Sequence, residues 1–338
     1  MTMALNSIGD LAQSFVQRRQ SAQLVRDLGR LTQEVSTGRA ADTAKHLSGN
    51  LLPLNDIERA LTLASAHRDV ARIAALDAGI MQTALGRVQE SADSLAAAAL
   101  VTEQAGGAAQ PGILAEAARA ALSTMIGALN SGAAGRTLFG GDVTDRPPLA
   151  DAETLLDALR TSLAAAPDQA ALRGALDSFF DAPGGGFATS VYRGGQAAAT
   201  AHALGAGETV ALRIRADDAA LRDQIKQVAM LSLLDDPALA LGHDDRAAIA
   251  REMGTGLLAG QDGITRLRAQ LGFAEERIAQ AQSRIDAEST SLGIARNDLL
   301  SVDIFDSASA LEQVQAQLET LYTLTARTAR LNLANFLS

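Results

Sequence analysis

The apolar residues of this chain recur mostly at helical spacing. In the C-terminal part an unbroken stripe alternates steps of three and four residues: Ile264, Leu267, Leu271, Ala274, Ile278, Ala281 and Ile285. This alternation is the a/d pattern of a coiled coil, whose stripe packs against a partner helix. A last stripe runs toward the C-terminus through Leu311, Val314, Leu318, Leu321, Thr325 and Thr328. Both segments are therefore predicted to be long amphipathic helices.

The N-terminal part repeats this organisation. Its first stripe begins at Ile8, Leu11 and Phe15 and continues at Leu24, Leu28, Leu31 and Val35. Gly38 follows, where a helix C-cap is expected. Residues 39–54 contain the breakers Ser48-Gly49-Asn50 and Pro53 and are predicted to be irregular. A helix over 55–102 follows, with a stripe at Ile57, Leu61, Ala64, Ile73, Leu76, Ile80, Ala84 and Val88, and then a helix over 113–130.

The middle of the chain, residues 135–217, has a different character because Gly and Pro are frequent there. We expect two short helices, over 152–166 and 169–180. Two strand candidates follow, 189–192 and 209–215, the second because Val210, Leu212 and Ile214 alternate with more polar positions. These elements predict a small α+β domain. Helix resumes over 219–234, after which Asp235, Asp236 and Pro237 break it.

The elements are nested, because helical segments at the two ends enclose the mixed middle. The predicted fold is mainly α: a long antiparallel helical bundle or coiled coil of paired N- and C-terminal segments, with a small inserted α+β domain. The predicted parts are an N-terminal inner helix (1–40), the N-terminal half of the bundle (41–134), the inserted domain (135–217), the C-terminal half of the bundle (218–296) and a C-terminal inner helix (297–338).

A helix with an apolar stripe must bury it against a partner. We expect the stripe of Ile264, Leu267, Leu271, Ile278 and Ile285 to form an intramolecular coiled-coil seam with the helix that carries Ile57 to Val88. The stripes nearest the two ends are the candidates for contacts completed by neighbouring subunits. Those predicted interface residues, whose contact with neighbouring subunits is an expectation, are Leu24, Leu28, Leu31, Val35, Leu311, Val314, Leu318, Leu321, Leu331 and Phe336.

Composition narrows the function classes. The net charge is −10, from 29 basic and 39 acidic residues among 338. Because nucleic acids and anionic membranes need clustered cations, we expect neither as a partner. The absence of Cys excludes disulfides and thiolate chemistry. No basic segment precedes an apolar run near Met1, and no apolar stretch reaches 18 residues, so neither a cleaved signal peptide nor a membrane span is expected.

No residue pattern favours catalysis. The four His residues (His46, His67, His202 and His243) lack metal-ligand spacing. The acidic pairs Asp217-Asp218, Asp235-Asp236 and Asp244-Asp245 suit helix N-termini better than acid–base chemistry or cation binding. The glycine runs carry no phosphate-loop motif. We therefore expect no catalytic, metal or cofactor site, and predict a structural protein rather than an enzyme.

Several passages resemble the bacterial flagellin family. Leu31–Arg39, with sequence LTQEVSTGR, resembles that family's LSSG-R helix end. Arg136–Gly141 (RTLFGG) with Thr144–Pro148 (TDRPP) resembles the YLFGG…TDTPP passage of the hook–filament junction proteins, the third hook-associated (FlgL) type. Val191–Gly194 with Thr209-Val210, and the ending Leu321–Leu337, are similar to further passages of that group. The family's acidic DDP passage is replaced here by Arg39–Asn50.

The resemblance implies a flagellar structural subunit that is secreted through the type III export apparatus without a cleaved leader. It implies a ring-like homo-oligomer that joins hook to filament and contacts an adjacent hook-associated protein and flagellin subunits. An export chaperone on the C-terminal helix is also implied. Alternatives are a filament flagellin, a coiled-coil type III secretion component of another kind, and a cytoplasmic enzyme on a helical scaffold, the least favoured.

Overall fold

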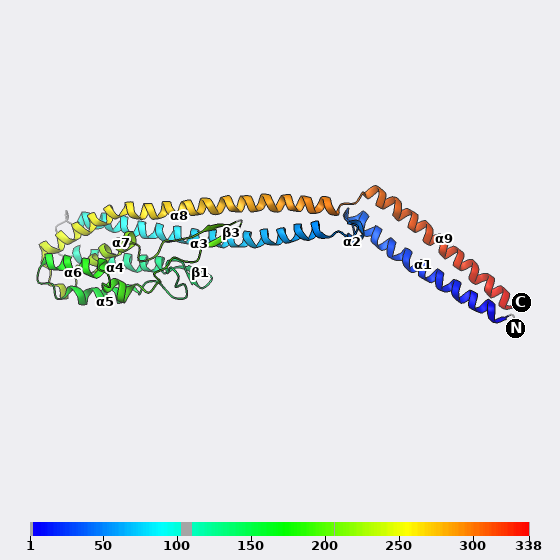
Figure 1. Ribbon diagram of the computed structural model, residues 1–338. Coiled ribbons are helices and arrows are strands. Elements are labelled where there is room, and N and C mark those ends of the chain that lie inside the picture. The colour runs from blue at the N-terminus through cyan, green and yellow to red at the C-terminus, as the bar shows by residue number, and fades with distance from the viewer. Residues whose placement is uncertain (1–2, 103–109, 206, 338) are drawn as a thin grey trace. The chain divides into compact units, whose positions relative to one another are not determined.

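The computed structural model describes residues 3–102, 110–205 and 207–337, with side chains described between 14 and 327 apart from 102–110 and 206. These residues are mainly helical, as predicted (Figure 1). Contacts divide the chain into two compact units. Unit 1 is Met1–Ser65 with Ala287–Ser338, and unit 2 is Ala66–Asp286. The predicted division into five parts stays a prediction.

The elements have the following bounds. The helices are α1 (Met3–Thr37), α2 (Thr43–His46), α3 (Leu52–Thr102), α4 (Gln110–Leu129), α5 (Ala152–Leu163), α6 (Gln169–Asp181), α7 (Ala219–Ser232), α8 (His243–Leu300) and α9 (Ile304–Leu337). A π-helical turn, η1, covers Phe187–Val191, and a 3-10 turn, η2, covers Pro237–Leu239. Two short antiparallel hairpins pair β1 (Gly132–Ala133) with β2 (Arg136–Thr137), and β3 (His202–Gly205) with β4 (Glu208–Val210).

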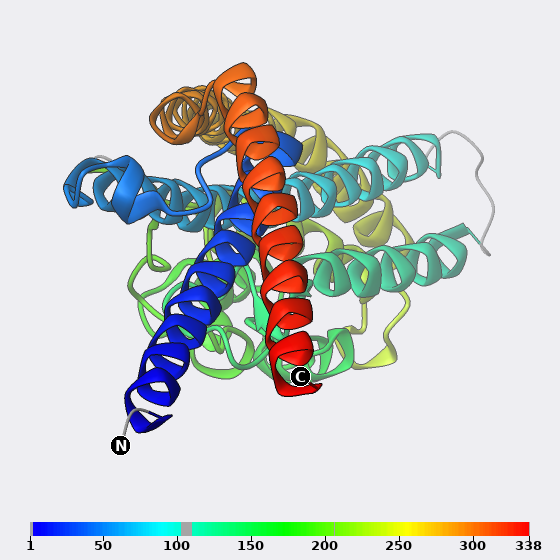
Figure 2. The ribbon, with the colours of Figure 1, turned by 90° about the vertical axis from the view of Figure 1, so that its right-hand side faces the viewer.

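In unit 1, α1 and α9 run antiparallel and side by side (Figures 1 and 2). As predicted, α1 ends at Gly38, which adopts a φ of +65° and donates its amide to the Glu34 carbonyl at 2.8 Å. The backbone then pairs with the segment that joins α8 to α9, because Ala40 donates to Leu300 at 2.9 Å and Val302 donates to Gly38 at 3.1 Å. The predicted irregular segment 39–54 contains one helical turn, α2, and α3 begins earlier than predicted.

In unit 2, α3 and α8 run antiparallel. The amide of Gln82 donates to the Arg268 carbonyl at 3.0 Å, and the guanidinium of Arg68 pairs with Asp286 at 2.8 Å. The α3 face that is buried carries small residues interleaved with larger ones: Ala71, Ala74, Ala78, Met81, Leu85 and Val88. The predicted stripe was therefore wrong at Ile73 and Leu76, which are 47% and 58% exposed. Alanine contributes little to a hydropathy pattern, yet it lets neighbouring helices approach closely.

Glycines allow α7 to pack closely on α8. A Cβ on Gly260 would lie 2.2 Å from the side-chain nitrogen of Gln224, and a Cβ on Gly263 would lie 2.8 Å from the Cβ of Ala220. Gln224 is fully buried and donates to the Leu257 carbonyl at 3.2 Å. A side chain at Gly263 would therefore push the two helices apart, and one at Gly260 would displace the buried amide of Gln224.

The inserted segment contains little sheet. The predicted strand 189–192 was wrong, because Phe187–Val191 forms a π-helical turn and only Tyr192 makes a bridge, with Leu149. Of the predicted strand 209–215, only the start belongs to β4, although Val210, Leu212 and Ile214 are buried as their alternation predicted. The strand β3 was not predicted. Beside this bridge, Asn130 pairs the backbone groups of Leu149 itself, since its side-chain nitrogen donates to the Leu149 carbonyl at 3.0 Å and its side-chain oxygen accepts from the Leu149 N–H at 2.9 Å.

The expectation that no apolar stretch reaches 18 residues was wrong. Pro111–Leu129 in α4 is long and apolar enough to cross a bilayer by length and composition alone. In the structure its residues Leu122, Met125 and Leu129 are fully buried, and α4 packs against α7. A buried bundle helix meets the same criteria, and this burial accounts for its composition.

Candidate assembly interface

The paired helices α1 and α9 carry the predicted interface residues. Leu24, Leu31 and Leu318 are buried within the pair, with 9%, 4% and 6% exposure. The remaining predicted positions with described side chains are half-buried: Leu28, Val35, Leu311, Val314 and Leu321. The side chains of Leu331 and Phe336 lie outside the described residues. One chain therefore covers part of this stripe by itself.

Larger apolar side chains are exposed elsewhere on the same two helices. On α1 these are Phe15, Val16 and Val25; on α9 and just inside its start they are Ile304, Phe305, Tyr322 and Leu324. Phe305 is 78% exposed and Phe15 is 64% exposed. Of these residues, sequence reasoning placed only Phe15 in a stripe, because the others fall outside the a/d register. The sequence feature that could have identified them is the presence of large apolar residues at positions outside a and d, which the heptad pattern assigns to the polar face.

A buried carboxylate fixes the end of α1. Glu34 is 6% exposed and accepts from the Arg30 guanidinium at 2.9 Å and from the Ala41 amide at 3.3 Å. Near the bridge to α9, the Arg39 guanidinium donates to the Asn297 side chain at 2.5 Å. The passage that resembles the flagellin LSSG-R motif thus ends α1 with a capped glycine and polar contacts.

The predicted coiled-coil seam lies in unit 2, on α8. Ile264, Leu271, Ile278 and Ile285 are at most 2% exposed, and Leu267 is half-buried. Beside this seam, Arg268 donates to the side chains of Gln82 at 3.2 Å and Gln89 at 2.7 Å. The seam is therefore closed within one chain along the part of α8 that belongs to unit 2.

The passage with sequence RTLFGG forms a packed centre in unit 2. Phe139 is fully buried, and the Gly140 carbonyl accepts from the Gly195 amide at 2.8 Å. Gly141 has a φ of +65°, and a Cβ there would lie 2.5 Å from a backbone oxygen. The hydroxyl of Tyr192 donates to the Gly195 carbonyl at 2.7 Å. Burial, helped by the nearby charge of Asp217, raises the pKa of Tyr192 to about 12.

The acidic pairs make structural contacts. Asp217 pairs with Arg215 at 2.7 Å, and Asp235 pairs with Arg119. Asp236 accepts from Arg160 at 2.6 Å; although burial opposes it, this hydrogen bond holds the pKa of Asp236 below its usual value. Asp245 accepts from the Gly242 amide at the start of α8. Asp217-Asp218 precedes α7 and Asp244-Asp245 begins α8, as the interpretation as helix N-termini predicted, whereas Asp235 and Asp236 pair with arginines of α4 and α5.

A small polar cavity contains another titratable cluster. Its volume is about 140 Å³, and it contains Asp77, Arg136 and His202. Asp77 is 2% exposed and lies 3.3 Å from the Arg136 guanidinium and 3.7 Å from His202 Nε2. Across the described parts of the chain, no three His, Cys, Asp or Glu residues come together as metal ligands would.

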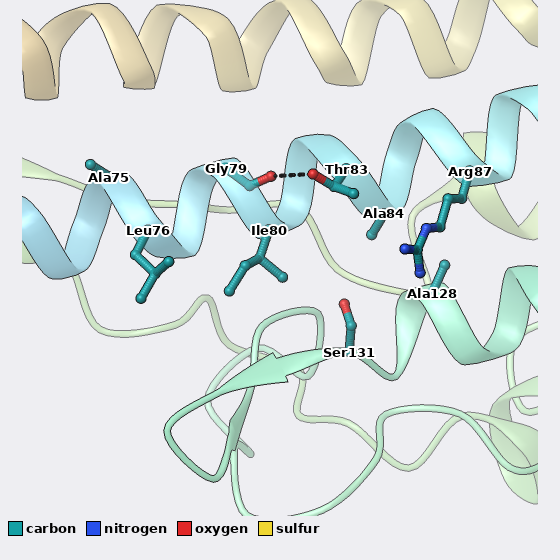
Figure 3. Close-up of a pocket in the computed structure, with 9 residues that line it drawn as sticks. All are labelled: Ala75, Leu76, Gly79, Ile80, Thr83, Ala84, Arg87, Ala128 and Ser131. Atoms are coloured by element: carbon teal, nitrogen blue, oxygen red, sulfur yellow. Dashed lines mark hydrogen bonds between the residues drawn. The ribbon is translucent and has the colours of Figure 1, made fainter.

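A second depression, of about 380 Å³, lies between α3 and the end of α4 (Figure 3). Its lining is mostly apolar and includes Leu76, Ile80 and Ala84 from α3 and Ala128 beside α4's end. The Arg87 guanidinium extends over Ala128 in the same view. No titratable pair converges in it, so the depression is suited to an apolar side chain rather than to chemistry.

Comparison with known proteins bears on the C-terminal helices. Residues 260–337 match the family model of the bacterial flagellin C-terminal helical region. The C-terminal part of this chain is flagellin-like. The flagellin-like region covers α8 from residue 260 onward, with the whole coiled-coil seam, and all of α9 to Leu337. It therefore contains the predicted interface residues of α9.

Solved structures offer a more distant likeness. The chain is similar to a protein described as a flagellar hook-associated protein from Vibrio parahaemolyticus, with 14% identity and a TM-score of 0.40, over 70% of this chain and 95% of that one. A likeness at this level bears on neither function nor partners. No curated protein matches the chain.

Proposed function

We propose that this protein is a structural subunit of the bacterial flagellum that assembles through its terminal helices into a ring between hook and filament. The observation that carries the proposal is the flagellin-like region at residues 260–337. Its last helix, α9, pairs with α1 at the other end of the chain, so both termini would enter the assembly together. Such a subunit is secreted to the flagellum and needs no enzymatic activity.

The exposed side chains of the α1–α9 pair support the assembly step. Phe15, Val25, Phe305 and Tyr322 are each about half exposed or more. Large apolar side chains gathered on both helices favour burial against other subunits. In this proposal the neighbours are further copies of the chain, an adjacent hook-associated protein and flagellin. Before assembly, a chaperone covers the same residues of α9.

The choice of junction protein over filament flagellin rests on the RTLFGG and TDRPP passages. In this chain the first passage forms the centre of unit 2, with Phe139 buried and Gly141 in a conformation that favours glycine. A filament flagellin remains the alternative. The two differ in number, because a junction ring needs few copies per flagellum, whereas a filament needs very many.

A deletion strain tests the proposal. We expect hooks without filaments, flagellin released into the medium, and recovery of filaments when the intact chain is supplied. Electron microscopy of the cells and immunoblots of the medium give both readouts. Normal filaments in the deletion strain would refute the junction role. A copy number per flagellum close to that of the filament protein would favour the alternative.

A point variant tests the role of the terminal helices. Val25→Asp changes a side chain that is 49% exposed, so the monomer should fold while assembly is lost. Gln23→Asp, on the same helix and also exposed, is the matched control and should restore filaments in the deletion strain. Circular dichroism of both purified variants checks folding. Equal complementation by the two variants would contradict the assembly role of this face.

A further inference from the structure

Phe273 is an exposed aromatic side chain in the middle of α8. It is 74% exposed, although Leu271, two residues earlier, is only 2% exposed. Successive residues of an α-helix are turned by about 100°, so Phe273 points roughly opposite to Leu271. Because Leu271 belongs to the buried seam, Phe273 projects away from it. An aromatic residue in such a position is typical of an anchor in a protein interface.

The apolar depression on α3 has the properties of a receptor for such an anchor. It has a volume of about 380 Å³ and is lined by Leu76, Gly79, Ile80 and Ala128, among others. Figure 3 shows Leu76 and Ile80 pointing to the side of α3 on which Ala128 and Ser131 lie, away from α8. The anchor therefore lies on the α8 side of the helix pair, and the depression lies on the α3 side.

The two features lie at about the same level along the pair. Hydrogen bonds place Gln82 opposite Arg268, and an ion pair places Arg68 opposite Asp286. Between these two points the antiparallel helices advance together, so Phe273 is about level with residues 77–81 of α3. A neighbouring copy displaced sideways, without a shift along the helices, would bring its Phe273 to the depression.

The flanking charges match in the same arrangement. Arg87 lines the depression eleven residues after Leu76, and exposed Asp262 lies eleven residues before Phe273. Eleven residues are close to three full turns, so each charge shares a face with its apolar residue. Because α3 and α8 are antiparallel, Asp262 of a level neighbour would lie beside Arg87. Within the described residues, neither of these two side chains makes an ion pair.

We propose that Phe273 of one copy inserts into the α3 depression of the next copy, with Asp262 pairing to Arg87. The inference rests on the proposed function, since it names the partner of unit 2 as a second copy of this chain. The contact is heterologous, because anchor and receptor are different surfaces. Because the anchor and the depression lie at the same level along the helix pair, each added copy is displaced sideways without a rise along the helices. Repetition of the contact therefore favours a closed ring over a helical filament.

Single-cysteine variants test the contact, because the natural chain contains no Cys. Phe273→Cys and Leu76→Cys are made separately in the full-length chain, mixed and oxidised mildly. A disulfide-linked heterodimer is expected, and it can form only between two copies. The matched control is Leu258→Cys, which is 48% exposed on the same helix. It lies about 22 Å along α8 from Phe273, at 1.5 Å per residue, and should not link to Leu76→Cys.

Two results would overturn the proposal. One is the absence of the heterodimer, both in the purified mixture and on flagella of cells that express the two variants together. The other is linking of Phe273→Cys only to itself, which would place the copies about a two-fold axis, or only to another flagellar protein. Asp262→Arg should reduce linking, and Arg87→Asp on the partner variant should restore it.

The outcome can be separated from that of the proposed function. Hooks without filaments in the deletion strain, together with no heterodimer, would refute this contact and leave the junction role intact. A heterodimer in a strain whose filaments are normal after deletion would support the contact and refute the junction role.

Discussion

Replacement of Leu271 by alanine tests the central feature of unit 2, the closed seam on α8. Leu271 is 2% exposed, so the substitution removes three carbon atoms from a packed position. Their transfer to water costs about 2.5 kcal/mol at roughly 0.8 kcal/mol per methylene. The cavity left behind adds to this, and we expect a total loss of about 3–4 kcal/mol in the free energy of unfolding.

The matched control is Phe273→Ala, two residues further along the same helix. Phe273 is 74% exposed, so its removal should change the stability of the monomer by about 0.5 kcal/mol or less. For a unit of this size, 1 kcal/mol corresponds to about 2–4 °C in melting temperature. Leu271→Ala should therefore lower the melting temperature by roughly 6–16 °C, and Phe273→Ala by about 2 °C or less.

The assay can be confined to unit 2. The chain has no Trp and two Tyr residues, of which Tyr192 lies in unit 2 and Tyr322 in unit 1. In a Tyr322→Phe background, tyrosine fluorescence during heating or urea unfolding reports unit 2 alone. If the two alanine variants unfold at the same temperature, the α8 seam does not stabilise unit 2 as we argue.

Three further predictions concern unit 2. Gly260→Ala places a methyl group 2.2 Å from the amide nitrogen of Gln224 and should cost about 1–3 kcal/mol in urea unfolding, with relief when Gln224→Ala is added. Asn130→Ala leaves two buried peptide groups unpaired and should cost about 2 kcal/mol in the same assay; a loss below about 0.5 kcal/mol would contradict their dependence on the Asn130 amide. Burial raises the pKa of Tyr192 to about 12, so an absorbance titration of the Tyr322→Phe variant should show a midpoint near pH 12 rather than 10. The stability that the protonated Tyr192 contributes is present below pH 10 and should be lost as the pH rises to 12.

Sequence patterns predicted the helices better than they predicted helix faces. The a/d register of Ile264 to Ile285 gave the correct buried side of α8, because that stripe consists of large residues at regular spacing. The end of α1 at Gly38 was also predictable, since a C-cap depends on local backbone geometry. Both signals are contained within a few turns of one helix.

The elements that were missed depend on distant partners. Phe187–Val191 has the β-branched and aromatic composition of a strand, yet it packs as a π-helical turn against α5 and α6. The hairpin of β3 and β4 contains Ala203 and Gly205, which have little strand propensity. Tertiary packing overrides local preference in such short segments, and a single sequence carries no record of that packing.

The buried positions of the α1–α9 pair were predicted in part for the same reason, while their contact with other subunits stays a prediction. Leu24, Leu31 and Leu318 followed from heptad spacing, whereas Phe305 and Val25 did not, because they lie outside the register. From the sequence alone, an apolar residue outside the register cannot be assigned to a surface until the position of the partner helix is known. Once α9 is seen beside α1, the same residue marks a second surface of the pair.

Helix α3 shows why two apolar stripes on one helix carry different information. Its stripe of Ala71, Ala74 and Ala78 is buried within unit 2, while Ile73 and Leu76 stay exposed on another face. Small residues let helices of one chain approach closely, and this geometry is set once, on folding. A contact between copies forms between chains that have already folded. There, a large side chain and a matching depression bury enough apolar area with few residues. We therefore attribute the exposed stripe of large residues on α3 to a contact with a neighbouring copy. Its residues are recognised because they were predicted to lie in the buried seam and are exposed instead.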